Sequence, residues 1–167
     1  MKPTKFFIIL SAITILILGL GVWLMAKPTS GSRLQQSAVA SGGKAEVPAT
    51  SFDWGTIDYG AGDAVAEFTI NNPGPGTLSL AEVGTSCMCT TAQIIINDQK
   101  SPYFGMHAKS SWVGQVPAGG QAKLKVVFDP AFHGPSGVGP VVRQVVMKTN
   151  DPEHPKLEFN LTGTVVK

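Results

Sequence analysis

Charged residues and cysteines are both scarce in this chain. Charged side chains make up 14% of its 167 residues, well below the roughly 25% of an average soluble protein. The two cysteines exclude a disulfide-dense scaffold and a four-cysteine zinc site. No amphipathic helical period of useful length occurs, and 19 glycines and 12 prolines favour many turns. We therefore do not expect a helical bundle.

Catalytic signatures are also absent. The chain contains no GxSxG, GxGxxG, P-loop or HExxH motif. Its acidic residues Asp58, Asp63, Glu67 and Glu82 show no spacing that pairs two carboxylates for acid-base work. We therefore expect no enzyme and identify no small-molecule substrate. Residues 45–167 contain eight basic and eleven acidic side chains, a net charge of −3. A folded part with this charge is not expected to bind nucleic acid.

One long apolar run lies near the N-terminus. Phe6 to Ala26 contains 21 uncharged residues, which as a helix cover roughly the 30 Å of a bilayer core. Lys2 and Lys5 precede it, so we expect an anchor over residues 1–27 with the N-terminus inside and the following domain outside the cytoplasmic membrane. A cleaved signal sequence is the alternative, although no small-x-small cleavage site ends the run.

Two further regions follow the apolar run. Residues 28–50 are rich in Ser, Gly, Ala and Gln without a sustained period, which predicts a flexible linker. Residues 51–167 alternate between apolar and polar side chains in several short stretches, such as Ala122 to Phe128. Turn signals separate these stretches, for example Asn150 to Pro152.

This pattern predicts an all-β domain, preceded by the single N-terminal transmembrane helix. About seven short strands separated by turns favour an immunoglobulin-like β-sandwich. The Cys…Trp…Cys spacing of antibody domains is missing. We therefore expect the sandwich to be stabilised by its core and not by a disulfide between its sheets.

Several motifs resemble those of a bacterial family of domains of unknown function. Phe52–Ile57 (FDWGTI) resembles the family's FDFGTI strand, and Thr85–Thr90 (TSCMCT) resembles its SCGCT motif with Met88 in place of Gly. Lys148–Pro152 (KTNDP) resembles its TNDP turn. Members are similar to the immunoglobulin-like PapD, major-sperm-protein and cilia-associated ASH domains. The resemblance implies a fold and a secretory address, and it implies no established reaction.

Cys87 and Cys89 are the residues of greatest chemical interest, and three interpretations remain open. The pair can stabilise a turn, exchange electrons with partner thiols, or bind a metal as thiolates. A disulfide that closes only three residues removes little loop entropy from the unfolded chain and is therefore a weak staple. In the redox interpretation, the pair serves a partner protein outside the cytoplasm.

The metal interpretation needs neutral ligands in addition to the two cysteines. Met106, His107 and His133 lie in Gly- and Pro-containing segments that follow the Cys-x-Cys motif. Thiolate, thioether and imidazole ligands suit Cu(I), and loops at one end of a sandwich cluster in space. Zn(II), held by the two cysteines and two histidines without methionine, is the alternative metal. The sequence thus predicts a copper site formed by Cys87, Cys89 and one or more of these three residues.

Residues 101–116 form a long segment with several aromatic side chains. It contains Tyr103, Phe104 and Trp112. Long loops are often functional, and exposed aromatic residues favour protein binding. We therefore expect either a surface that binds another extracytoplasmic protein or a lid that folds back over the sandwich.

Overall fold

The computed structural model describes residues 42–107 and 110–167. The predicted anchor, Phe6 to Ala26, and residues 28–41 of the predicted linker lie outside the described residues. Within the part that is described, no helix has the length and apolar character needed to cross a membrane. Membrane attachment therefore stays a prediction.

The described residues form strands, together with one short 3-10 helix. The elements are β1 (Ser51–Asp58), β2 (Ala64–Asn71), β3 (Leu78–Thr85), β4 (Thr90–Ile96), β5 (Gln99–Lys100), β6 (Val113–Val116), β7 (Gln121–Phe128), η1 (Gly134–Gly137), β8 (Gly139–Thr149) and β9 (Lys156–Val166). The all-β expectation is confirmed. The expected seven strands correspond to the seven longest, and the short β5 and β6 are additional.

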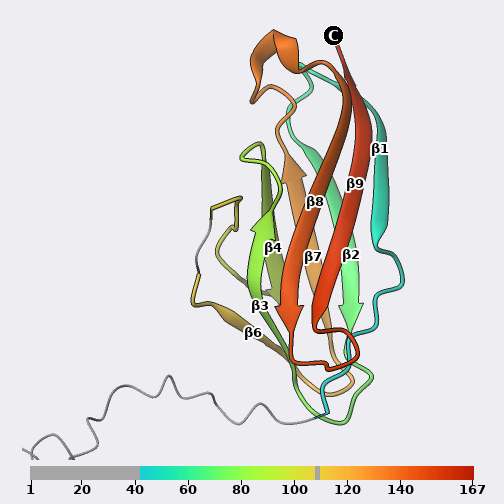
Figure 1. Ribbon diagram of the computed structural model, residues 1–167, viewed down its shortest axis with the longest axis vertical. Helices are drawn as coiled ribbons and strands as arrows, with labels where there is room; N and C mark the ends of the chain where they lie inside the picture. Colours follow the sequence, from blue (N-terminus) through green and yellow to red (C-terminus); the bar gives the residue numbers. More distant parts are fainter. Residues whose placement is uncertain (1–41, 108–109) are drawn as a thin grey trace, which may run out of the picture. The chain divides into compact units, whose positions relative to one another are not determined.

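The strands form two sheets. One sheet has the order β1-β9-β8-β3-β6, and the other has the order β2-β7-β4-β5. The pairs are antiparallel except β1 with β9, which are parallel. Figure 1 shows the long β8 and β9 in front of β7 and β2. The neighbours β9-β8-β3 and β2-β7-β4 reproduce the strand orders of the two sheets of an immunoglobulin-like sandwich.

The core lies between the two sheets and follows the period-two pattern. In β7, Ala122, Leu124 and Val126 are fully buried, while alternate positions face outward. Phe68 of β2 meets Phe159 of β9 across the sandwich, with ring centroids 4.9 Å apart. The disulfide does not link the two sheets, because it joins two residues of one turn. The two sheets are thus held together by apolar packing.

Part of the predicted linker belongs to the folded domain. Glu46 forms a backbone bridge with Asn71, with N···O distances of 2.8 and 3.0 Å. Ala45 is buried, and its N–H donates to the Asp151 carboxylate over 2.8 Å. The predicted linker of residues 28–50 therefore extends too far at its C-terminal end. The sequence could not predict this, because two residues are too few to show an apolar period. Their position depends on contacts with Asn71 and Asp151.

The long segment after β5 divides into buried and exposed parts. The backbone of Phe104 pairs with Ala92 through two hydrogen bonds of 2.8 Å, and its side chain enters the core. The Trp112 ring packs 5.4 Å from the Phe104 ring. Tyr103 is exposed. The buried Phe104 and the partly buried Trp112 thus fold back onto the sandwich, whereas Tyr103 of the same segment faces solvent.

Candidate functional site

The candidate site is the turn between β3 and β4, which contains a Cys87–Cys89 disulfide. The hydroxyl of Thr85 donates to the carbonyl oxygen of Cys87 at 3.0 Å and reaches that of Thr90 at 2.9 Å. The N–H of Thr90 also donates to Cys87 O over 3.2 Å. These hydrogen bonds close the turn through the backbone. The turn therefore has support that is independent of the disulfide.

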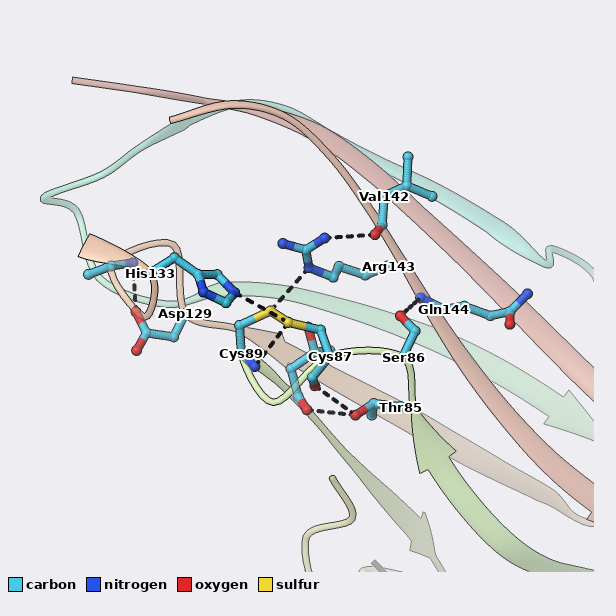
Figure 2. Close-up of a disulfide and its surroundings, with 11 residues drawn as sticks. Thr85, Ser86, Cys87, Cys89, Asp129, His133, Val142, Arg143 and Gln144 are labelled. Atoms are coloured by element: carbon cyan, nitrogen blue, oxygen red, sulfur yellow. Dashed lines mark hydrogen bonds between the residues drawn. A yellow bond between two sulfur atoms is a disulfide. The ribbon is translucent and has the colours of Figure 1, made fainter. Parts of the chain in front are cut away.

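The buried sulfur of the pair contacts a cation from the neighbouring strand. Cys89 is 3% exposed, and Nε of Arg143 in β8 donates to its Sγ over 3.1 Å. Arg143 is itself fixed, because Nη1 donates to Val142 O at 2.8 Å and Cζ lies 5.1 Å from the centre of the Phe128 ring. Figure 2 shows the guanidinium directed at the disulfide.

Arg143 gives this end of the sandwich a fixed positive charge. Partial burial lowers the pKa of its guanidinium, but an arginine side chain remains protonated in proteins. A cation beside a cysteine sulfur stabilises the thiolate relative to the thiol. Arg143 thus favours the charged form that Cys89 takes when the disulfide opens.

The second sulfur is more accessible and has a different neighbour. Cys87 is only partly buried, and its Sγ lies 3.5 Å from Nε2 of His133. His133 is exposed in the loop after β7 that leads into η1, and the Phe132 ring contacts it edge-on at 5.2 Å. This loop and the β3–β4 turn lie toward the same end of the sandwich as the C-terminus (Figure 1).

The predicted copper ligands are only partly brought together. Cys87, Cys89 and His133 each offer a ligand atom, and these atoms lie within 4.8 Å of one another. His107 is exposed and does not belong to this group. Met106 is exposed beside it. As a disulfide the two sulfurs are not thiolates, so a metal site at this position requires the reduced pair.

Sequence reasoning missed Arg143 as a residue of the site. One feature of the sequence could have indicated it. Arg143 is a charged residue on a strand face that is otherwise apolar, between Val141 and Val145. A long cation at such a position must find a partner at the edge of the core. Here that partner is the Cys89 sulfur.

A cleft with both apolar and acidic walls adjoins the disulfide. Met88 and Phe132 line it, and both are exposed. The carboxylates of Asp63 and Asp129 line the same cleft, as does Cys89. Exposed apolar side chains that gather at one place on a surface are suited to contact with another protein.

A second group of potential ligands has a structural explanation. Asp151, Glu153 and His154 lie close together in the β8–β9 turn. Burial raises the pKa of Asp151, but hydrogen bonds from the Ala45 and Glu153 N–H groups and from His154 lower it to about 2. The carboxylate is thus already occupied by donors of its own chain and joins the N-terminal segment to this turn.

Comparison with known proteins supports the fold and does not assign a family. No family model matches the chain. No curated protein matches it either. The family resemblance of the sequence motifs therefore stays a prediction.

Solved structures with a similar fold are numerous. A protein of unknown function from Porphyromonas gingivalis W83 is similar with a TM-score of 0.57 and 21% identity, over 75% of this chain and 48% of that chain. The described chain thus spans about half of that protein. PapD-like domain 7 of human CEP192, described as an ASH/PapD-like domain, matches with a TM-score of 0.47 and 17% identity, over 74% of this chain and 86% of its own. WR4, a C. elegans MSP family member, matches with a TM-score of 0.41 and 15% identity, over 73% of this chain and 97% of its own.

Proposed function

We propose that this protein is a membrane-tethered, extracytoplasmic binding module without catalytic activity of its own. Its Cys87–Cys89 pair interconverts between disulfide and dithiol by exchange with the thiols of a partner protein. The observation that supports this proposal is the placement of a polar side chain beside each sulfur. Arg143 donates to Cys89 over 3.1 Å, and His133 lies 3.5 Å from Cys87.

A cation beside the pair favours the reduced form over the disulfide. Opening the disulfide turns an uncharged sulfur of Cys89 into a thiolate that Arg143 can stabilise by a charge-assisted hydrogen bond. Stabilisation of the reduced form raises the reduction potential of a dithiol pair.

A purely structural role explains the site less well. A disulfide that closes three residues contributes only about 1.5 kcal/mol in the chain-entropy relation. The same turn is already closed by the Thr85 hydroxyl and by the Thr90 N–H. The turn therefore has little need of the disulfide for its conformation.

The reduction potential tests the redox proposal. The full-length chain is equilibrated in buffers of defined reduced and oxidised glutathione, quenched with acid, alkylated and weighed by mass spectrometry. We expect a two-electron transition between about −120 and −270 mV, the range of known exchange proteins. A pair that stays oxidised below about −300 mV behaves as a structural disulfide, and that result would reject the proposal.

Variants of Arg143 and Lys148, two cationic residues of β8, test whether the cation beside Cys89 raises the reduction potential. Arg143→Met removes the cation at Cys89, so its midpoint should move to a more negative potential. Lys148→Met removes a cation that pairs with Glu82 over 2.7 Å and does not contact the disulfide. The midpoint of Lys148→Met should match that of the wild type.

Binding of Cu(I) by the reduced pair is the second candidate function. It is favoured by the ligand atoms of Cys87, Cys89 and His133, which lie within 4.8 Å of one another. Two thiolates and one imidazole form a set of soft and intermediate ligands suited to Cu(I). A competition titration of the reduced full-length chain with Cu(I) against a chelator tests this function.

The proposed location rests on the Phe6 to Ala26 run and on the disulfide. Disulfides persist in oxidising compartments outside the cytoplasm. Protease added to spheroplasts should digest the domain of a tethered chain. Protection of the domain until the membrane is dissolved would place it inside and would reject the proposed orientation.

A further inference from the structure

The two sulfurs of the disulfide differ in their surroundings, and this difference gives the exchange a direction. Cys89 is 3% exposed and belongs to a buried cluster with Phe128 and Val141, whereas Cys87 is partly exposed. Resting on the proposed exchange function, we infer that the partner thiolate attacks Cys87 and that Cys89 leaves as a thiolate held by Arg143.

Access favours attack at Cys87. A thiolate displaces a disulfide sulfur along the line of the bond, so the attacker must approach the sulfur from the side opposite to the leaving group. Cys89 is 3% exposed and packs in one cluster with Phe128 and Val141, so little of its surface is open to an attacker. An approach to Cys87 comes from the turn surface, where Met88 is 59% exposed. The accessible sulfur is therefore the electrophile.

Charge favours the departure of Cys89. The Arg143 Nε–H already points at Cys89 Sγ over 3.1 Å, so it can bind the negative charge where that charge develops. The Val142 carbonyl and the Phe128 ring hold the guanidinium in this orientation. Donors that are fixed before the reaction need no rearrangement as the charge forms. Arg143 is thus a positioned stabiliser of the leaving thiolate.

The exchange is balanced in atoms and electrons. The partner thiol first loses its proton to solvent, and its sulfur then forms a bond with Cys87 Sγ. The Cys87–Cys89 bond breaks, and its electron pair remains on Cys89 Sγ as a thiolate. A second partner thiolate attacks the partner sulfur of this mixed disulfide and releases Cys87 as a thiolate. Two electrons thus pass to the cysteine pair, and the partner is oxidised to a disulfide.

The position of the mixed disulfide tests the direction. The oxidised full-length chain is mixed with glutathione, quenched with acid at short times and digested. Fragmentation between the two cysteines, which Met88 separates, locates the glutathione adduct. We expect the adduct on Cys87. An adduct that forms first on Cys89, or equally on both residues, would overturn the inference.

Variants of Arg143 test the stabiliser. We expect the rate of adduct formation to fall about tenfold in Arg143→Met, in keeping with the loss of one charge-assisted hydrogen bond. Arg143→Lys retains the charge and should recover most of this rate. Lys148→Met, the control on the same strand, should react as the wild type does. An unchanged rate in a folded Arg143→Met protein would overturn the role of Arg143.

Failure of this inference can be told from failure of the proposed function. If the disulfide never exchanges with glutathione, both the proposed redox function and the inferred direction of exchange are wrong. A chain that exchanges with a midpoint in the expected range, but forms its adduct on Cys89, keeps the redox function and loses only the direction. Melting temperatures of all variants, measured in parallel, show whether a slow rate reflects loss of the fold.

Discussion

The backbone N–H of Ala45 donates a 2.8 Å hydrogen bond to Oδ2 of Asp151, which lies 106 residues later in the chain. Asp151 is 2% exposed, and its other oxygen accepts the N–H of Glu153 over 2.9 Å. The carboxylate thus joins the segment that enters the sandwich to the turn between β8 and β9. This contact gives the KTNDP motif a structural role.

Asp151 should make the stability of the domain depend on pH in the acid range. The pKa of its carboxyl group is about 2 in the folded chain, against about 3.9 in an unfolded chain. The ionised form is therefore the one that folding favours. Its contribution, about 2 to 3 kcal/mol, is fully present above about pH 4 and is lost as the pH falls toward 2. Urea unfolding at several pH values between 2 and 6 measures this.

Asp151→Asn should flatten this acid dependence and lower the stability at pH 7. Asp53→Asn is the control, since Asp53 is an exposed residue whose carboxylate accepts the local N–H of Gly55. The control should keep the wild-type pH profile. An Asp151→Asn profile as steep as that of the wild type would assign the acid dependence to other carboxylates.

Asn72 should be intolerant of replacement by Asp. Its side chain is buried, and Nδ2 lies 2.8 to 3.0 Å from the carbonyl oxygens of Gly76, Val116 and Pro117. An aspartate places a buried carboxylate against these carbonyls and removes their donor. We expect a loss of at least about 3 kcal/mol in the free energy of unfolding. Asn71→Asp, at a half-buried neighbouring position, should be close to wild type in urea unfolding.

The sequence predicts the long strands because each of them turns alternate side chains into the core, which leaves an apolar–polar alternation in the sequence. Alternation in Ala122 to Phe128 indicates a strand without any knowledge of its partner. β5 and β6, with two and four residues, are too short for a period. Residues 43–46 join the fold through polar contacts with Asn71, Asn72 and Asp151 and through Ala45, which packs in the core. Contacts between distant residues of this kind leave no local pattern.

The same distinction applies to the candidate site. The Cys-x-Cys motif is local, so the sequence indicates it directly. The neighbours of its sulfurs depend on strand register: the pairing of Thr85 with Val145 brings Arg143 beside Cys89. His107 and His133 both lie in loops, and their sequence contexts do not distinguish them. The structure places only His133 beside the pair.

Removal of a core ring should show that apolar packing holds the two sheets together. Phe159 is fully buried, and its ring meets that of Phe68 from the opposite sheet at 4.9 Å. Phe159→Ala should lower the free energy of unfolding by about 3 to 5 kcal/mol. Val142→Ala, at a position 67% exposed on β8, should change it by less than about 0.5 kcal/mol. Similar losses in both variants would contradict this account of the core.

The two loop histidines should differ in their effect on copper binding. His133 lies 3.5 Å from Cys87 Sγ, and its imidazole can complete a ligand set with the two reduced cysteines. His107 lies outside that group. His133→Ala should weaken Cu(I) binding by the reduced chain at least about tenfold, since loss of an outer-shell partner alone typically has an effect of 10- to 100-fold. An anaerobic titration against a competing chelator measures the affinity.

His107→Ala is the matched control for this copper prediction, because it removes an exposed imidazole from another loop. It should bind Cu(I) as the wild type does. The double variant Cys87→Ser, Cys89→Ser should not compete with the chelator, since both thiolates are gone. Equal weakening by both histidine variants would mean that the loop after Phe104 moves toward the cysteines in the reduced chain. Equally poor competition by the wild type and the double-serine variant would exclude the copper function and leave thiol exchange as the chemistry of the pair.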